Sequence, residues 1–254
     1  NPYGFVRRYW MKSGVIVTNP GWGNPDIDKP ECDYDRTIGI LKVIQNGRVA
    51  ALICNIANHG DTIGGSLVSG DWYSHFVREL QYRFKEGVPV LVVDDASGDI
   101  NHIDRMGGKT RHYTERGQIL AAEAIRVIEK ASTPDAIYEE YQQKYDVIFD
   151  EKEAPEDATQ EEKDLAYDIA VNGNKRPERP VGSGMSRLLL VYEEEMEASG
   201  QTEEEVPVQV SMVGDTFIVA MPGEPYHAFG RAIKQGCPTG KCIISTLSHG
   251  MFGY

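Results

Sequence analysis

The sequence lacks a long apolar run and is short of positive charge. A membrane-spanning helix needs about 20 consecutive apolar residues, and no run in the chain reaches that length, so we expect no integral membrane segment. Lysine and arginine number 26 against 39 aspartates and glutamates, which gives a net charge of −13. Because nucleic-acid binding depends on clustered cations, we expect no nucleic-acid partner.

Cysteine is also scarce. The four cysteines, Cys32, Cys54, Cys237 and Cys242, follow no zinc-knuckle spacing. Cys54 lies inside an apolar run, which is typical of a buried free thiol. Cys237 and Cys242 flank a Pro-Thr-Gly-Lys turn, and only geometry decides whether they are bridged.

An initiator methionine and a signal-peptide pattern are both missing, since the chain opens with Asn1-Pro2-Tyr3. We therefore expect an excerpt that lacks the N-terminal part of a longer protein. The sequence does not indicate the localisation or the oligomeric state.

At 254 residues the chain is long enough to bury one substantial core. Two apolar runs at 38–45 and 48–56 are separated by Asn46-Gly47, the clearest hairpin signal in the sequence. Helical and strand patterns then alternate at 72–84, 88–93 and 113–131. This order predicts one α/β domain over residues 1–254, with a mixed β-sheet flanked by helices and a site at the strand ends.

Two segments depart from this alternation. Residues 1–36 are rich in Gly, Pro, Asn and Asp and are expected to wrap the core without regular structure. Residues near 150–205 are strongly acidic and predict a solvated helical insertion. After the insertion, the pattern predicts a second hairpin, a helix and a last strand at 206–213, 216–221, 226–235 and 241–247.

Several predicted strands end in a glycine-containing loop that bears a polar side chain. These residues are His59, the Gly98-Asp99-Ile100-Asn101 segment, Glu224 and Tyr254. If the strands share a sheet, their ends can converge on one site. Imidazole and carboxylate groups suit Zn²⁺, although no local motif such as H-E-x-x-H joins them. The alternatives are a hydrogen-bonded loop histidine, a carboxylate at a helix start and a terminal packing tyrosine.

Five short motifs, in this order, resemble the neutral (non-lysosomal) ceramidases and their bacterial relatives. They are Ala57-Asn-His59-Gly-Asp-Thr62, Ser69-Gly70-Asp71, Ser97-Gly98-Asp99-Ile100-Asn101, Met221-Pro222-Gly223-Glu224-Pro225 and His249-Gly-Met-Phe-Gly-Tyr254. The resemblance implies an α/β catalytic domain with one zinc ion held by two histidines, a glutamate and a tyrosine. It implies that His59, Glu224 and Tyr254 are ligands and that the other histidine lies upstream of this chain.

One of these motifs departs from the family pattern. The ceramidases carry Gly-Asp-Val-Ser-Pro-Asn, whose serine contacts the substrate amide, whereas Asn101 stands at the serine position here. An amide side chain can still donate a hydrogen bond to a carbonyl oxygen. From the resemblance we predict that Asn101, with Gly98 and Asp99, places the substrate, and that Arg7 is the arginine near the site. Asp99 can equally serve only to close a turn.

The resulting hypothesis is zinc-dependent hydrolysis of an amide or related acyl bond by metal-activated water. We expect a small-molecule or lipid-like substrate, and the small polar residues around the motifs disfavour a long-chain ceramide. The alternatives are a non-catalytic metal- or ligand-binding relative of the same fold, and an esterase that acts on a carbohydrate or other polar ester.

Overall fold

The computed structural model describes residues 3–64, 68–85, 87–108, 111–129 and 207–250. Within these residues the chain forms three α-helices and eleven β-strands, and the strands fall into four small sheets. The predicted α/β class is confirmed in this mixed form. The prediction of a single mixed sheet is wrong, because the side chain of Asn55 separates the central sheet from the C-terminal one.

The central sheet holds β5 (Ile38–Gln45), β6 (Arg48–Ile56) and β7 (Val90–Asp94) in that order. β5 and β6 are antiparallel, while β6 and β7 are parallel, so the sheet is mixed. Asn46 and Gly47 both adopt positive φ, at 52° and 73°. This is the backbone of a tight hairpin turn whose twist matches the strands it joins, and the predicted hairpin is confirmed.

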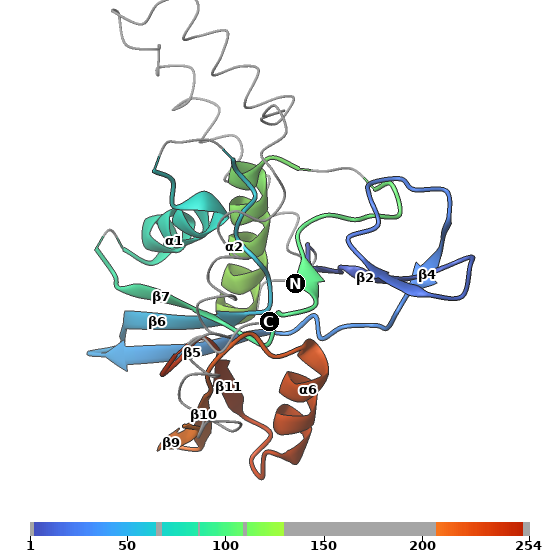
Figure 1. Cartoon of the computed structure of the whole chain (residues 1–254). Helices are drawn as coiled ribbons and strands as arrows, with labels where there is room; N and C mark the ends of the chain where they lie inside the picture. Colours follow the sequence, from blue (N-terminus) through green and yellow to red (C-terminus); the bar gives the residue numbers. More distant parts are fainter. Residues whose placement is uncertain (1–2, 65–67, 86, 109–110, 130–206, 251–254) are drawn as a thin grey trace, which may run out of the picture.

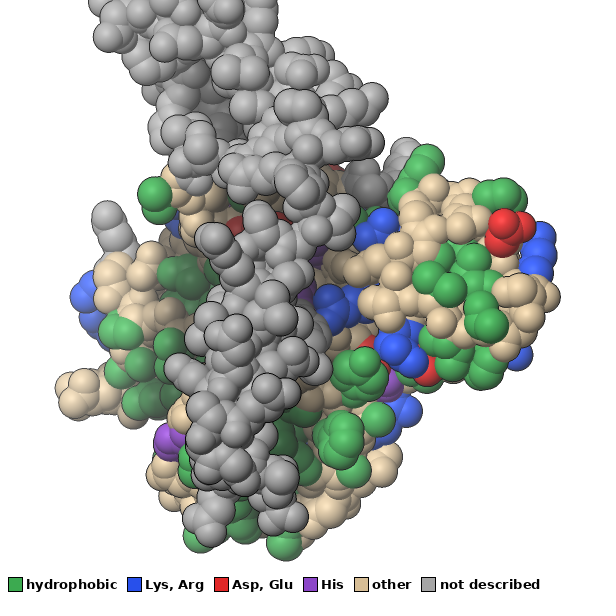
Figure 2. Space-filling model, viewed as in Figure 1, with side chains coloured by type: hydrophobic (Ala, Val, Ile, Leu, Met, Phe, Trp, Pro, Cys, Tyr) green, Lys and Arg blue, Asp and Glu red, His purple; other side chains and the backbone are tan. Residues whose placement is uncertain are grey.

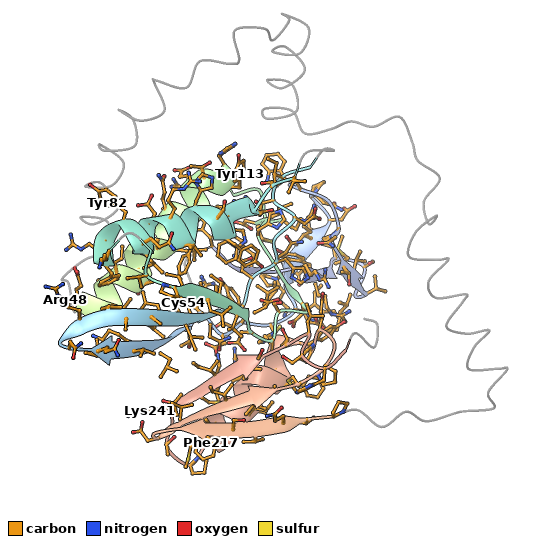
Figure 3. All side chains as sticks on the ribbon, turned by 90° about the vertical axis from the view of Figure 1, so that its left-hand side faces the viewer. Arg48, Cys54, Tyr82, Tyr113, Phe217 and Lys241 are labelled. Carbon is orange, nitrogen blue, oxygen red and sulfur yellow. The ribbon has the colours of Figure 1, made fainter. Side chains whose placement is uncertain are left out.

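Two helices, α1 (Asp71–Phe84) and α2 (Tyr113–Glu129), cover one face of this sheet (Figure 1). Side chains that alternate along β6 point toward them, because successive residues of a strand face opposite ways. The core beneath the helices contains Leu52, Cys54, Ile56, Trp72, Phe76, Leu80, Leu120 and Ile125. Cys54, labelled in Figure 3, is fully buried there as a free thiol, as predicted. Burial raises the pKa of this thiol to about 12.

A third layer lies below the central sheet in Figure 1 and is built from the C-terminal part of the chain. It contains β9 (Gln209–Val213), β10 (Thr216–Ala220), β11 (Cys242–Ser245) and helix α6 (His227–Gly236). β10 pairs antiparallel with β9 and parallel with β11. Cys237 and Cys242 are both free, so the bridge that the sequence left open is absent.

The side chain of Asn55 joins this layer to the central sheet. Its Nδ2 donates to the backbone oxygen of Ile244 at 2.7 Å and to that of Val93 at 3.1 Å. Its Oδ1 accepts from the backbone nitrogen of Ile244 at 3.2 Å. A buried amide therefore satisfies backbone groups that a continuous ladder would otherwise pair. The strands consequently divide into separate sheets instead of forming the single one predicted.

The N-terminal segment corrects a second expectation. Instead of an irregular wrapping, it forms the antiparallel sheet β3-β2-β4, from Ile16–Thr18, Arg8–Met11 and Ile27–Pro30. β1 (Phe5–Val6) pairs with β8 (Ile100–Asn101). Val6, Tyr9, Ile27, Tyr34 and Ile100 form a separate small core. In Figure 2 the β3-β2-β4 sheet stands as a lobe at the right of the main body, with Lys and Arg side chains along the junction. Strands of two to four residues are too short for alternation to reveal them.

Other expectations fall outside the described residues, namely the acidic helical insertion near 150–205 and Tyr254. The single-domain organisation stays a prediction. Of the helices in the described part of the chain, none combines the length and apolar character that a bilayer crossing requires.

Lys234 fastens α6 to the rest of the molecule, and this contact predicts a dependence of stability on pH. Its Nζ donates to the carboxylates of Asp35, at 2.9 Å, and of Asp95. Burial acts to raise the pKa of Asp35, but hydrogen bonds from Thr37 and Lys234 outweigh it and lower that pKa to about 2. A carboxyl whose pKa is lower in the folded state stabilises the fold above its ordinary pKa. That contribution is lost as the pH falls from about 4 to about 2.

We therefore expect Asp35→Asn to lower the free energy of unfolding at pH 7 by about 1–2 kcal/mol. Denaturant titrations at several pH values should also show a weaker loss of stability below pH 4 than in the parent protein. Asp215→Asn is the matched control, because Asp215 forms an exposed ion pair with Lys241 and exposed pairs contribute little. Equal effects of the two substitutions would contradict the assignment.

Candidate functional site

Two of the predicted metal ligands lie in contact. His59 follows the end of β6 and Glu224 lies between β10 and α6, yet His59 Nε2 and Glu224 Oε2 are 3.2 Å apart. Their side chains are 22% and 13% exposed. Two ligand atoms on one tetrahedral zinc ion are about 3.3 Å apart for bonds of about 2.0–2.1 Å. The separation and the donor types therefore fit Zn²⁺, although metal binding by these residues stays a prediction.

The start of α1 shapes the loop that carries His59. The indole Nε1 of Trp72 donates to the backbone oxygen of His59 at 3.0 Å. The carboxylate of Asp71 accepts from the backbone nitrogen of Thr62 at 2.7 Å and also from its hydroxyl. The N-cap of α1 is Gly70, and Asp71 is the first helical residue, with φ of 50°. Its side chain faces backward onto the His59 loop, so it fixes the loop instead of capping the helix.

Gly98 lies directly against the segment that carries Glu224. Its backbone nitrogen donates to the oxygen of Pro225 at 3.0 Å. A Cβ atom placed on Gly98 would lie 2.2 Å from the backbone oxygen of Glu224, so a larger residue cannot fit without displacement. Gly98 therefore has a packing role beside Glu224.

Arg7 lies on the other side of the same loop. Its Nη2 donates to the backbone oxygen of Gly98, and its backbone nitrogen donates to the oxygen of Asp99 at 2.9 Å. The structure thus brings Arg7, Gly98 and the segment around Glu224 into one neighbourhood.

Asp99 forms a buried pair with His227, the first residue of α6. Its Oδ1 accepts from the backbone nitrogen of His227 at 2.8 Å, and its Oδ2 lies 2.6 Å from Nδ1 of the ring. Their side chains are only 4% and 5% exposed. Burial acts to raise the pKa of Asp99, but the hydrogen bonds from His227 outweigh it and the pKa is lowered. Asp99 therefore joins its own loop to the start of α6.

Cys32 completes a group with this pair that sequence reasoning missed. Ligand atoms of Cys32, Asp99 and His227 lie within 4.8 Å of one another, and among the described residues this is the group of three that could hold a metal ion. The identity of such a metal is not shown. The three residues are far apart in the sequence and follow no ligand spacing, so no local signal could have found them.

Asn101 lies in β8 with its side chain buried. Its Nδ2 donates to Oδ1 of Asn19 at 3.3 Å, and its Oδ1 accepts from the backbone nitrogen of His102 at 2.6 Å. These contacts hold the amide in place within the N-terminal lobe. The predicted role of Asn101 toward a substrate carbonyl stays a prediction, as does the role of Tyr254, which the structure does not describe.

Two further ionisable residues near the site were not predicted. Asp94 ends β7, and its Oδ2 accepts from Ser97 Oγ at 3.0 Å. Burial raises the pKa of Asp94 to about 7, and the charges of Asp95 and Glu224 add to this. Asp94 ends β7 beside the last residue of β6, because Ile56 and Asp94 are register partners of parallel strands, and His59 lies in the loop that follows β6. The position of Asp94 at the end of a predicted strand was the signal in the sequence that could have identified it.

The other residue is His102, which follows Asn101. Burial lowers the pKa of His102 to about 4, and the positive charge of Arg116 acts in the same direction. The imidazole of His102 is therefore neutral at physiological pH.

Comparison with known proteins gives one structural similarity. No protein-family model and no curated protein sequence matches the chain. The solved structure of neutral ceramidase from Pseudomonas aeruginosa is similar, with a TM-score of 0.43 and 14% sequence identity. The similarity covers 83% of this chain and 38% of that chain, so this chain spans well under half of the length of the solved protein.

Proposed function

We propose that the chain is a zinc-dependent hydrolase that cleaves an amide or related acyl bond. The observation that supports this most is the 3.2 Å separation of His59 Nε2 and Glu224 Oε2. An imidazole and a carboxylate converge here from two strand ends, at the separation expected of two ligands on one zinc ion. The metal-free alternative is an ordinary hydrogen-bonded His–Glu pair, and metal analysis separates the two.

In this proposal His59, Glu224 and Tyr254 are ligands of the metal. When bound, Zn²⁺ supplies Lewis acidity, which polarises a carbonyl group and makes water reactive at neutral pH. The Asp71 carboxylate and the Trp72 indole hold the His59 loop in place. Gly98 keeps the neighbouring loop close to Glu224, which no other residue could do at that distance.

Two residues are proposed to act on the substrate. The guanidinium of Arg7 lies against the Gly98 loop and carries a fixed positive charge, which would stabilise negative charge that develops on the carbonyl oxygen. The amide of Asn101 would donate to the same oxygen, and this requires it to exchange its 3.3 Å hydrogen bond with Asn19 for one with the substrate. A long bond of this kind is weak, so the exchange costs little.

The proposal is tested with the purified protein, loaded with zinc and then treated with a chelator. Short N-acyl amides, acyl esters of sugars and a C12 ceramide form the substrate panel. We expect chelator-sensitive hydrolysis of the short amides that zinc restores, and little or no cleavage of the ceramide. The residues around the site are small, polar or charged, and covering unpaired polar groups with a lipid chain costs about 1–3 kcal/mol each.

Each of the other outcomes of this assay would lead to a different conclusion about the substrate or the activity. Cleavage of the sugar esters alone would replace the amidase assignment with an esterase assignment. A zinc-loaded protein that hydrolyses none of the panel would indicate a binding protein of the same fold. Efficient hydrolysis of the ceramide would show that the substitution of asparagine for serine at position 101 is tolerated.

A further inference from the structure

We propose that Cys32, Asp99 and His227 bind a second metal ion, of the zinc type, separate from the site at His59 and Glu224. Such an ion would fasten the segment that follows β4 to the start of α6. The inference does not depend on the proposed hydrolase activity, because it rests on a different group of side chains.

The three side chains come from three separate segments. Cys32 lies two residues after the end of β4, Asp99 lies between β7 and β8, and His227 begins α6. Their ligand atoms converge to within 4.8 Å of one another. Asp99 and His227 are almost fully buried, and Cys32 is half-buried. Buried groups of this kind are usually paired or bound to a metal.

The donor set suits zinc. A thiolate, an imidazole and a carboxylate offer sulfur, nitrogen and oxygen ligands, all of which Zn²⁺ accepts in tetrahedral geometry. The carboxylate is also supported as a ligand would be, because its Oδ1 is held at 2.8 Å by the backbone nitrogen of His227. Ligating carboxylates are typically fixed by such a second hydrogen bond.

Binding of an ion must alter the short contact between Asp99 and His227. Oδ2 and Nδ1 are 2.6 Å apart, which is the distance of a short charge-assisted hydrogen bond with one proton between the two atoms. Two ligand atoms on one zinc ion would be about 3.3 Å apart. Binding therefore releases that proton, together with the thiol proton of Cys32, and widens the contact by about 0.7 Å. Small side-chain rotations are enough for this change.

A surface groove reaches the Cys32 end of this group. The groove has a volume of about 460 Å³, and its lining includes Cys32, Tyr34, Val6, Tyr9 and Asp104. Since Cys32 lines it, an ion can reach the thiol from solvent. Water in the groove can also take the fourth position that three protein ligands leave open.

The thiolate makes this site distinguishable by experiment, because the His59 site contains no sulfur. Cobalt(II) replaces zinc in such sites and gives a near-ultraviolet thiolate-to-metal absorption only when a cysteine is bound. We expect that absorption when the purified protein is titrated with Co²⁺. We expect Cys32→Ser to abolish it and to weaken Zn²⁺ binding at this site by more than about 100-fold, since loss of an outer-shell partner alone costs about 10- to 100-fold.

Three matched variants make the assignment specific. Cys237→Ser and Cys242→Ser should leave the absorption unchanged, and His59→Ala should leave it unchanged while it removes the other ion. Survival of the absorption in Cys32→Ser, or its absence from the parent protein at saturating Co²⁺, would overturn the proposal. Serine is nearly isosteric with cysteine, so the variant is expected to fold. A parent protein that shows the absorption but hydrolyses none of the substrate panel would count against the proposed function alone.

Discussion

His59→Ala is expected to remove one equivalent of zinc and to reduce hydrolysis of the preferred substrate below detection. The side chain is one of the two proposed ligands that the structure describes, and its Nε2 lies 3.2 Å from Glu224 Oε2. Without the imidazole the coordination shell is open and the carboxylate has lost its facing group. Because an outer-shell change alone costs about 10- to 100-fold in metal affinity, loss of a direct ligand should cost more. Metal analysis of the purified variant and a hydrolysis assay check both effects.

His112→Ala is the control, because His112 lies beside the start of α2 and bonds to Thr114. It should keep its zinc and its activity. Glu224→Gln should behave like His59→Ala, since the amide keeps the size of the side chain but removes the charge that a metal requires. Full zinc occupancy in both His59→Ala and Glu224→Gln would place the metal elsewhere in the protein and end the proposal for this site.

Gly98→Ala is expected to reduce turnover by more than about 100-fold and to lower the free energy of unfolding by about 1–3 kcal/mol, the usual cost of overpacking. The added Cβ would lie 2.2 Å from the backbone oxygen of Glu224 and 3.1 Å from the ring of Tyr226. The nearest atom belongs to the backbone, so no side-chain rotation relieves the overlap. The loop must move away from Glu224, and the carboxylate then loses its position relative to His59.

Gly64→Ala is the matched control for this substitution. Gly64 lies in the loop that follows His59, its φ is not positive, and no atom of the described residues lies within 4 Å of a Cβ placed on it. It should therefore behave like the parent protein. Denaturant unfolding and steady-state kinetics on both variants separate steric displacement from the simple loss of a glycine. If Gly98→Ala keeps full turnover, the close packing beside Glu224 has no role in the reaction.

The elements that could be predicted are those with local signals. The hairpin at Asn46-Gly47 follows from residues that tolerate positive φ, and helices α1 and α2 follow from apolar spacing over more than three turns. The approach of His59 to Glu224 could be predicted in outline, because both follow strands whose ends converge. The sequence indicates where the strands end, but it does not give the distance between the His59 and Glu224 side chains.

The features that escaped prediction depend on contacts between distant residues. The N-terminal strands are held by their partners and by a small core around Ile100, not by their own sequence pattern. Cys32, Asp99 and His227 meet only because β4, the β7–β8 connection and α6 are neighbours in the fold. The boundary between the central sheet and the sheet of β9, β10 and β11 depends on one asparagine, whose hydrogen bonds no periodicity can reveal.

The position of Asn55 has a consequence for how the protein unfolds. The side chain of Asn55 and the backbone nitrogen and hydroxyl of Thr246, which donate to the backbone oxygens of Asp94 and Asp95, link the C-terminal layer to β6 and β7. Proteins open locally in cooperative units that often coincide with supersecondary motifs, below the global unfolding free energy. β9–β11 and α6 should then exchange amide hydrogens together and earlier than β6. Since Glu224 belongs to that unit and His59 does not, the same opening would separate the two residues, and a bound metal would slow it.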